Sequence, residues 1–263
     1  METKLKAKVN GTVRFFYRYT PAAMGLYFVL YDIAFCALES WRRPVHLVHC
    51  RLDDLIPFCR FAVIPYVMWF GWVPLMLIML MLKSRGLFWR TFGGLAAGTS
   101  FTLALYAVYP TGLRLRQSVS GVDFCAQLVR LIYRTDTPTN VCPSLHVFVT
   151  VVILLALFNA DWTSVRFRRV NGLLGLAICC STVLLDQHSL IDVVLGIILA
   201  LWVFAVFCRI PAPSVQDWMQ PRQRALRPDA LLARDRRIVR PAGDQSRLTR
   251  HPVGRQADGQ GVG

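Results

Sequence analysis

The stretch VLLDQHSLIDVV, residues 183–194, joins two apolar segments through a short polar turn. Asp186, His188 and Asp192 lie within seven positions of one another in this otherwise apolar run. Ionisable side chains are rare inside membrane-spanning segments, and where they occur they commonly mark functional sites. The stretch therefore predicts two membrane helices that meet at a turn, with a chemically active histidine at that turn.

Apolar blocks continue on the N-terminal side of this turn, and 55% of the 263 residues are hydrophobic. A membrane helix needs about 20 mainly apolar residues, whereas a helix of a soluble protein shows a polar face at helical period, which these blocks almost lack. The sequence therefore predicts an all-α, polytopic membrane protein built as a bundle of six transmembrane helices. The expected spans are residues 21–38, 61–82, 92–109, 145–160, 170–185 and 189–207.

The net charge of +15 gives the expected orientation. Lys and Arg precede the first span, lie between spans two and three and between spans four and five, and follow the last span. The positive-inside rule places these segments in the cytoplasm, so that the loops 39–60, 110–144 and 186–188 are extracytoplasmic. Topology and attraction to anionic lipid headgroups account for the charge, and nucleic-acid binding is the weaker interpretation.

Composition divides the chain into three regions: a basic cytoplasmic N-terminal segment (1–20), a six-helix membrane domain (21–208) and a basic cytoplasmic tail (209–263). The tail is rich in Arg, Pro, Asp, Gln and Gly and has few aromatic residues, so it cannot bury a core and is expected to be disordered. In the outer loop, DFCAQLVRLIYR (123–134) has apolar residues at helical spacing. This segment predicts a short helix along the outer membrane surface.

Two motifs on the expected outer face place histidines beside groups suited to phosphoryl transfer. His188 and Asp192 are spaced i and i+4 on one helical face, and an acid that accepts from one imidazole nitrogen leaves the other nitrogen free to attack. His146 follows Ser144 in a predicted helix N-terminus, which is a ready anion site. A second histidine can then protonate a leaving oxygen. These residues predict phosphoryl transfer through a phosphohistidine, without a required metal or other cofactor.

Pro143-Ser144-Leu145-His146 and Ser181-x6-His188-x3-Asp192 resemble the second and third motifs of the type 2 phosphatidic acid phosphatase superfamily. That superfamily includes lipid phosphate phosphatases, undecaprenyl diphosphate phosphatases, inositol phosphorylceramide synthases and vanadium haloperoxidases. The resemblance covers about residues 90–208 and implies a six-helix membrane bundle. It also implies roles for single residues: His188 as nucleophile, Asp192 as its orienter, His146 as general acid, and Arg116, Ser144 and Ser181 as phosphate-binding groups.

The chain departs from the family pattern at two cationic positions. When Arg116 is aligned with the arginine of the family's first motif, Tyr109 stands where lysine is expected and Gln117 where proline is expected. In the third motif, Thr182 replaces the arginine that usually follows the serine. The alignment ranks Arg116 above Arg114 as a phosphate ligand. The residues that could compensate for the missing cations are Arg114, Arg130 and Arg134.

The expected function is that of a membrane-bound lipid phosphate phosphatase, which hydrolyses a lipid phosphomonoester or diphosphate at the extracytoplasmic face. Its expected partners are the lipid substrate and membrane lipids. One alternative is a lipid phosphotransferase that moves a phosphoryl headgroup to an alcohol acceptor. A second is a non-enzymatic transporter or scaffold, which the missing cations keep open. Asp186 has no assigned role and is expected to be a solvated acid at the membrane boundary.

Overall fold

The computed structural model describes residues 20–41 and 46–207. The expected tail and almost all of the expected N-terminal segment lie outside the described residues. Short elements join the helices: strands β1 (His46–Leu47) and β2 (Thr111–Gly112), and the 3-10 turns η1 (Asp53–Leu55) and η2 (Arg60–Ala62). The α-helices are α2 (Thr20–Trp41), α3 (Val63–Lys83), α4 (Arg85–Val108), α5 (Phe124–Thr135), α6 (Leu145–Phe158), α7 (Val165–Leu184) and α8 (Leu190–Phe207).

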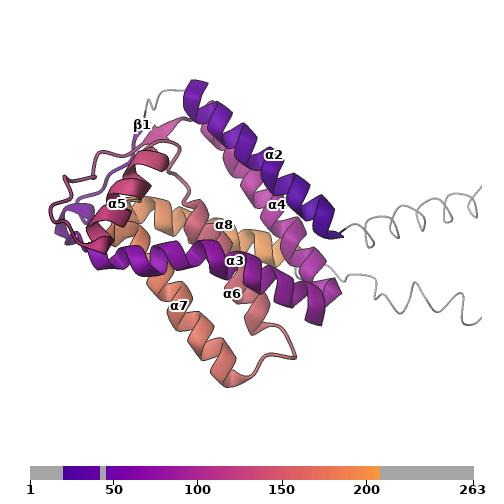
Figure 1. The fold of residues 1–263 in the computed structure, drawn as a ribbon. Coiled ribbons are helices and arrows are strands. Elements are labelled where there is room, and N and C mark those ends of the chain that lie inside the picture. Colours follow the sequence, from indigo (N-terminus) through magenta and orange to yellow (C-terminus); the bar gives the residue numbers. More distant parts are fainter. Residues whose placement is uncertain (1–19, 42–45, 208–263) are drawn as a thin grey trace, which may run out of the picture. The chain divides into compact units, whose positions relative to one another are not determined.

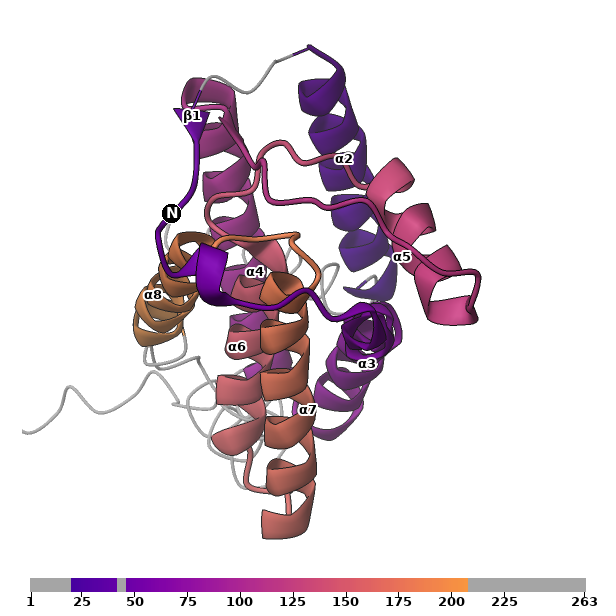
Figure 2. The ribbon, with the colours of Figure 1, turned by 90° about the vertical axis from the view of Figure 1, so that its left-hand side faces the viewer.

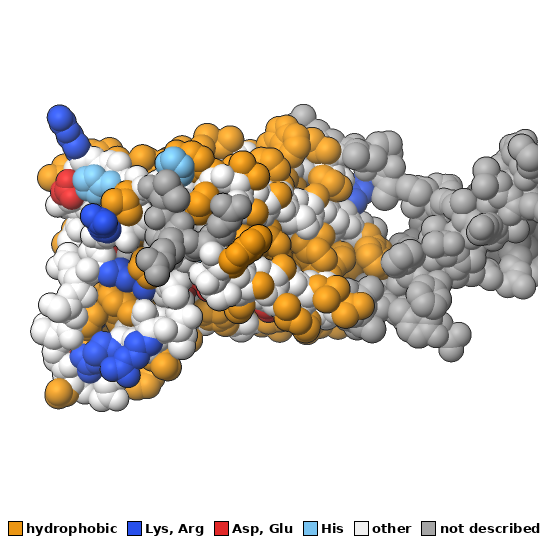
Figure 3. Space-filling view, turned by 90° about the horizontal axis from the view of Figure 1, so that it is seen from above, with side chains coloured by type: hydrophobic (Ala, Val, Ile, Leu, Met, Phe, Trp, Pro, Cys, Tyr) orange, Lys and Arg blue, Asp and Glu red, His pale blue; other side chains and the backbone are white. Residues whose placement is uncertain are grey.

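Five helices of the described part are long and apolar enough to cross a membrane: α2, α3 with the preceding turn, α4, α7 and α8. The α6 helix is apolar but has only 14 residues, fewer than the about 17–25 that a span needs. Hydrophobic side chains cover most of the visible described surface, and Lys and Arg gather mainly at one end (Figure 3). The prediction of a mainly helical protein with several membrane-length helices is confirmed.

Two predicted spans start too late in the sequence. The span expected at 92–109 belongs to α4, which begins at Arg85, and the span expected at 170–185 belongs to α7, which begins at Val165. The first turns of both helices contain arginines, which lower the local hydropathy but are good helix formers. Hydropathy therefore marks the apolar part of these helices, whereas backbone hydrogen bonding sets where they begin.

The α6 helix lies at the centre of the bundle, where it contacts α3, α4, α7 and α8 (Figure 2). Its packing against α4 is close because α4 has no side chain at Gly98. A Cβ atom there would lie 2.1 Å from the Phe148 ring, a distance that real Cβ contacts do not reach. The α2 helix packs on the outside against α4, and the Tyr27 hydroxyl donates to the Ala96 carbonyl over 2.8 Å.

The three loops that were expected on one side meet at one end of the bundle (Figure 1). Strand β1 pairs in parallel with β2, and the Cys59 N–H donates to the Leu184 carbonyl over 2.8 Å. The two-residue strands were not predicted because they are too short to show any periodicity. Helix α5 also lies at this end, and the prediction of a helix at 123–134 is confirmed; Asp123 caps it by accepting from the Ala126 N–H.

Candidate active site

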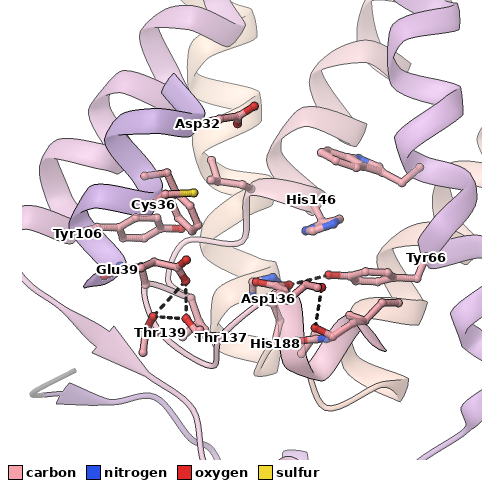
Figure 4. Close-up of a pocket in the computed structure, with 18 of the residues that line it drawn as sticks. Asp32, Cys36, Glu39, Tyr66, Tyr106, Asp136, Thr137, Thr139, His146 and His188 are labelled. Carbon is pink, nitrogen blue, oxygen red and sulfur yellow. Dashed lines mark hydrogen bonds between the residues drawn. The ribbon is translucent and has the colours of Figure 1, made fainter. Parts of the chain in front are cut away.

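A cavity of about 450 Å³ lies at the end of the bundle where α6 begins and where α7 turns into α8 (Figure 4). Aromatic side chains of α2, α3 and α4 make up much of its wall, and they include Phe35, Trp69 and Tyr106. His146 and His188 face it from α6 and from the α7–α8 turn. Pockets that are mainly apolar and carry a few convergent polar groups are typical of binding sites for small molecules and lipids.

Backbone hydrogen bonds hold the turn that carries His188, and Asp192 lies beside its ring. The Thr182 carbonyl accepts from the N–H groups of Gln187 (3.0 Å) and His188 (3.1 Å), which closes the turn after α7. Asp192 lies one helical turn further on, and its Oδ2 is 3.4 Å from His188 Nδ1. The Asp192 carboxylate is fully buried and also accepts from the Ser189 N–H over 2.9 Å. The acid is therefore placed to fix the ring orientation of His188.

The start of α6 is attached directly to α8. Ser144 caps α6 by accepting from the Val147 N–H, and its own N–H donates to the backbone carbonyl of Asp192 over 3.0 Å. Gly196 allows this approach, since a Cβ atom there would lie 2.8 Å from the Ser144 carbonyl oxygen. The contact fixes the distance between the helices that carry the two histidines.

His146 stands in the first turn of α6 and packs against aromatic rings of α3. Its ring centroid lies 4.6 Å from that of Tyr66 and 4.3 Å from that of Trp69. The rings of His146 and His188 are 6.1 Å apart between centroids. His146 Nε2 is buried and has no hydrogen-bond partner among the described residues. His146 thus has an unpartnered ring nitrogen at the cavity that His188 also lines.

Asp53 supports the histidine turn from a distant segment. Its carboxylate accepts from the Ser189 hydroxyl (2.7 Å) and from the Leu190 N–H (2.9 Å), so it caps α8 from the loop that precedes α3. Burial acts to raise the pKa of Asp53, yet the hydrogen bonds from Leu190, Ser189 and Cys50 hold it below its usual value. Sequence reasoning missed this residue because the cap comes from another part of the chain, whereas cap signals are sought next to the helix.

Arg116 reaches the cavity only through another side chain. It donates to the Gln187 Oε1 atom and to the Tyr133 carbonyl (3.2 Å), and its guanidinium lies 4.7 Å from the centroid of the Tyr133 ring. Burial lowers the pKa of Arg116 from its usual value, and nearby Asp136 acts in the opposite direction. Gln187 is part of the cavity wall, whereas Arg116 lies behind it and contacts the cavity lining through Gln187.

The other residues predicted to bind phosphate lie away from the cavity wall. Ser144 and Ser181 are fully buried, and the Ser181 hydroxyl donates to the Ile178 carbonyl over 2.6 Å. Arg114 is exposed. The structure therefore brings His146, His188 and Asp192 together and places Arg116 next to them. The hydroxyl groups of both serines make hydrogen bonds to the backbone of the bundle. Their role in phosphate binding stays a prediction.

Asp186 is buried, so its interpretation as a solvated boundary acid is wrong. It is 7% exposed and has a φ angle of 51°. The long outer loop covers this turn, and the Tyr133 hydroxyl of α5 donates to the neighbouring Leu185 carbonyl over 2.7 Å. Burial raises the pKa of Asp186 to about 6. The folded protein therefore favours the neutral carboxyl group.

We expect Asp186→Asn to stabilise the protein at high pH only. A carboxyl group whose pKa is raised by folding contributes stability below its unfolded pKa of about 4, and this stability is lost as pH rises through about 6. Asparagine cannot ionise and tolerates a positive φ. The variant should melt at the same temperature as wild type near pH 4.5 and at a higher temperature at pH 8. The control is Asp161→Asn at an exposed site, and an equal shift at both pH values would contradict the assignment.

Within residues 20–41 and 46–207, no group of three or more His, Cys, Asp or Glu side chains is placed to hold a metal ion. No family model, no curated protein and no solved structure matches the chain in the comparisons made. The fold and the site define a mainly helical protein with membrane-length helices and a cavity faced by two histidines.

Proposed function

We propose that this protein is a polytopic membrane enzyme that cleaves a lipid phosphate ester or diphosphate through a phosphohistidine on His188. The observation that supports it best is the pairing of His188 with buried Asp192, opposite His146 and across a largely apolar cavity. A histidine oriented by an acid and facing a second histidine is suited to nucleophilic attack followed by proton transfer. The apolar wall suits a substrate with a lipid tail.

The proposed reaction has two steps. In the first, His188 Nε2 attacks phosphorus and a P–N bond forms. The P–O bond to the leaving group, which is the lipid alcohol in a phosphate ester and the lipid phosphate in a diphosphate, breaks, and His146 gives a proton to the leaving oxygen. In the second, water or another alcohol gives a proton to His146 and attacks phosphorus, and the P–N bond breaks. Asp192 holds the His188 ring throughout and stabilises its positive charge. His146 ends each cycle protonated, as it began.

The membrane topology is also part of the proposal. The five membrane-length helices together with α6 would form the six spans, with both termini in the cytoplasm and the site at the extracytoplasmic face. Helix α6 spans roughly 21 Å at 1.5 Å per residue, so the bilayer would thin locally or flanking residues would extend the span. The residue motifs and this topology together favour membership of the type 2 phosphatidic acid phosphatase superfamily.

The proposal is tested with the purified full-length chain in mixed micelles that contain one phospholipid at a time. The substrates are phosphatidate, an isoprenyl diphosphate and a phosphorylated long-chain amine. Release of the lipid alcohol, or of isoprenyl phosphate from the diphosphate, is measured with water alone and with added glycerol, so that hydrolysis and transfer are both detected. Turnover of at least one lipid is expected. Absence of turnover with all of them, in a folded sample, would favour the transporter or scaffold interpretation.

We expect His146→Ala to lower kcat/KM, which reports the first step, about a hundredfold or more for a lipid alcohol leaving group, because general acid catalysis contributes about 10²–10⁴. A nitrophenyl phosphate ester should lose much less, since nitrophenolate leaves without a proton. The ratio of the two rate losses is the measurement, and His49→Ala, at an exposed histidine, is the control. Equal losses for both substrates would show that His146 does not supply the proton.

A further inference from the structure

Two buried side-chain amides in the cavity wall have NH₂ groups without a hydrogen-bond partner among the described residues. Gln187 is 2% exposed and Asn140 is 5% exposed, and both line the cavity. The Nε2 atom of Gln187 and the Nδ2 atom of Asn140 have no hydrogen-bond partner among the described residues. A buried donor without a partner costs about 1–3 kcal/mol. The wall therefore offers donor groups beside His188 that an oxygen-bearing ligand would satisfy.

Hydrogen bonds hold the side-chain amide of Gln187 and the backbone of Asn140 in place. Gln187 Oε1 accepts from the Arg116 guanidinium, so the NH₂ end of the same amide is the end left free. Asn140 has a φ angle of 55°, a left-handed conformation that asparagine adopts more readily than most residues. Its backbone N–H donates to the Thr111 carbonyl over 2.7 Å, which anchors it to β2. The Gln187 amide and the Asn140 backbone are thus held before a ligand arrives.

The charged groups of the cavity wall are all acidic, apart from the histidines. None of the described residues that line the cavity is Lys or Arg, whereas the lining includes the acidic residues Asp32, Glu39 and Asp136. Asp136 accepts from the Tyr66 hydroxyl over 3.1 Å, and Glu39 accepts from the Thr139 hydroxyl over 3.2 Å. Repulsion between like charges grows in a partly desolvated site, so a doubly charged phosphate is disfavoured here relative to a singly charged one.

We propose that Asn140 and Gln187 bind the non-bridging oxygens of a phosphodiester, and that the site therefore prefers a singly charged phosphodiester lipid to a doubly charged phosphomonoester. This inference rests on the proposed function and deepens it. Neutral amides provide hydrogen bonds without a compensating charge, which suits a monoanion. Arg116 acts through Gln187, whose amide it positions.

The test compares two lipids that differ by one methyl group and one charge: phosphatidate and its methyl ester, phosphatidylmethanol. Diacylglycerol release is measured for each with the full-length chain in mixed micelles that also contain glycerol. Diacylglycerol forms whether water or glycerol accepts the phosphoryl group, so the readout does not depend on the acceptor. We expect kcat/KM for phosphatidylmethanol to exceed that for phosphatidate at least tenfold.

Isosteric variants test the two amides. Gln187→Glu and Asn140→Asp each replace the NH₂ donor with an acceptor oxygen at nearly constant shape, and each should raise KM for phosphatidylmethanol at least tenfold. Gln187→Lys adds a cation and should lower the preference for the diester at least tenfold. The controls are Gln127→Glu on the exposed face of α5 and Asn159→Asp at the exposed end of α6. Melting temperatures establish that each variant is folded.

The outcomes separate this inference from the function on which it rests. Turnover of both lipids with phosphatidate preferred would overturn the inference and leave the proposed function intact. The same holds if folded Gln187→Glu and Asn140→Asp keep the wild-type KM. If neither lipid nor any lipid of the wider panel is turned over, both proposals fail.

Discussion

Replacing His188 with alanine is expected to lower the turnover of every substrate by at least about a thousandfold. The imidazole supplies the atom that bonds to phosphorus, and no other described side chain of the cavity combines a ring nitrogen with a buried acid one turn away. Removal of a nucleophile leaves only the part of catalysis that binding and electrostatics provide. The measurement is kcat for lipid alcohol release by the purified variant.

Two comparisons make the His188→Ala result specific. His49→Ala removes an exposed histidine, one that pairs with Asp54, at the same end of the protein, and it should keep wild-type activity. Thermal melting should show that His188→Ala folds, since the ring lies in a turn that backbone hydrogen bonds close. Activity within tenfold of wild type in folded His188→Ala would rule out the mechanism.

Asp192→Asn is expected to lower kcat about a hundredfold or more while KM stays near its wild-type value. Asparagine keeps the size of the side chain and an oxygen that can accept the Ser189 N–H. It loses the negative charge that favours the correct His188 tautomer and stabilises the charged ring during attack. A purely structural role would instead change the melting temperature or affect KM together with kcat.

Asp54→Asn is the matched control, because Asp54 is exposed and accepts from His49 instead of supporting the site. It should change neither kcat nor KM. The stability of Asp192→Asn should differ little from that of wild type, since Asp192 Oδ2 lies 3.4 Å from His188 Nδ1, a long contact. A variant with wild-type kcat would show that this acid does not orient the nucleophile.

The helices could be predicted from hydropathy, but the residues at which they begin and the short β1–β2 pair could not. The bounds predicted from the apolar run at 61–82 nearly match those of α3, Val63–Lys83, because a long apolar block has few other stable arrangements. The beginnings of α4 and α7 are hidden by arginines at Arg85 and Arg166. The β1–β2 pair depends on contacts between segments far apart in the sequence, which local periodicity does not record.

The core of the site was also predictable, because its spacing is local. His188 and Asp192 are one helical turn apart, and Ser144 is a typical N-cap residue for the helix that carries His146. Asp53 and the burial of Asp186 were not predictable, since both depend on how outer loops fold over the turn. The unpaired NH₂ groups of Gln187 and Asn140 were not predictable either, because hydrogen-bond partners depend on the three-dimensional packing of the cavity wall.

Transient labelling of His188 tests the central claim most directly. Wild-type protein and His188→Ala are mixed with a turned-over lipid labelled with ³²P and quenched within one turnover under alkaline conditions, in which phosphohistidine survives. We expect an acid-labile, alkali-stable label on the peptide that contains His188 in wild type, and none in the variant. Turnover by wild type without any such label, or a label on another residue, would contradict it.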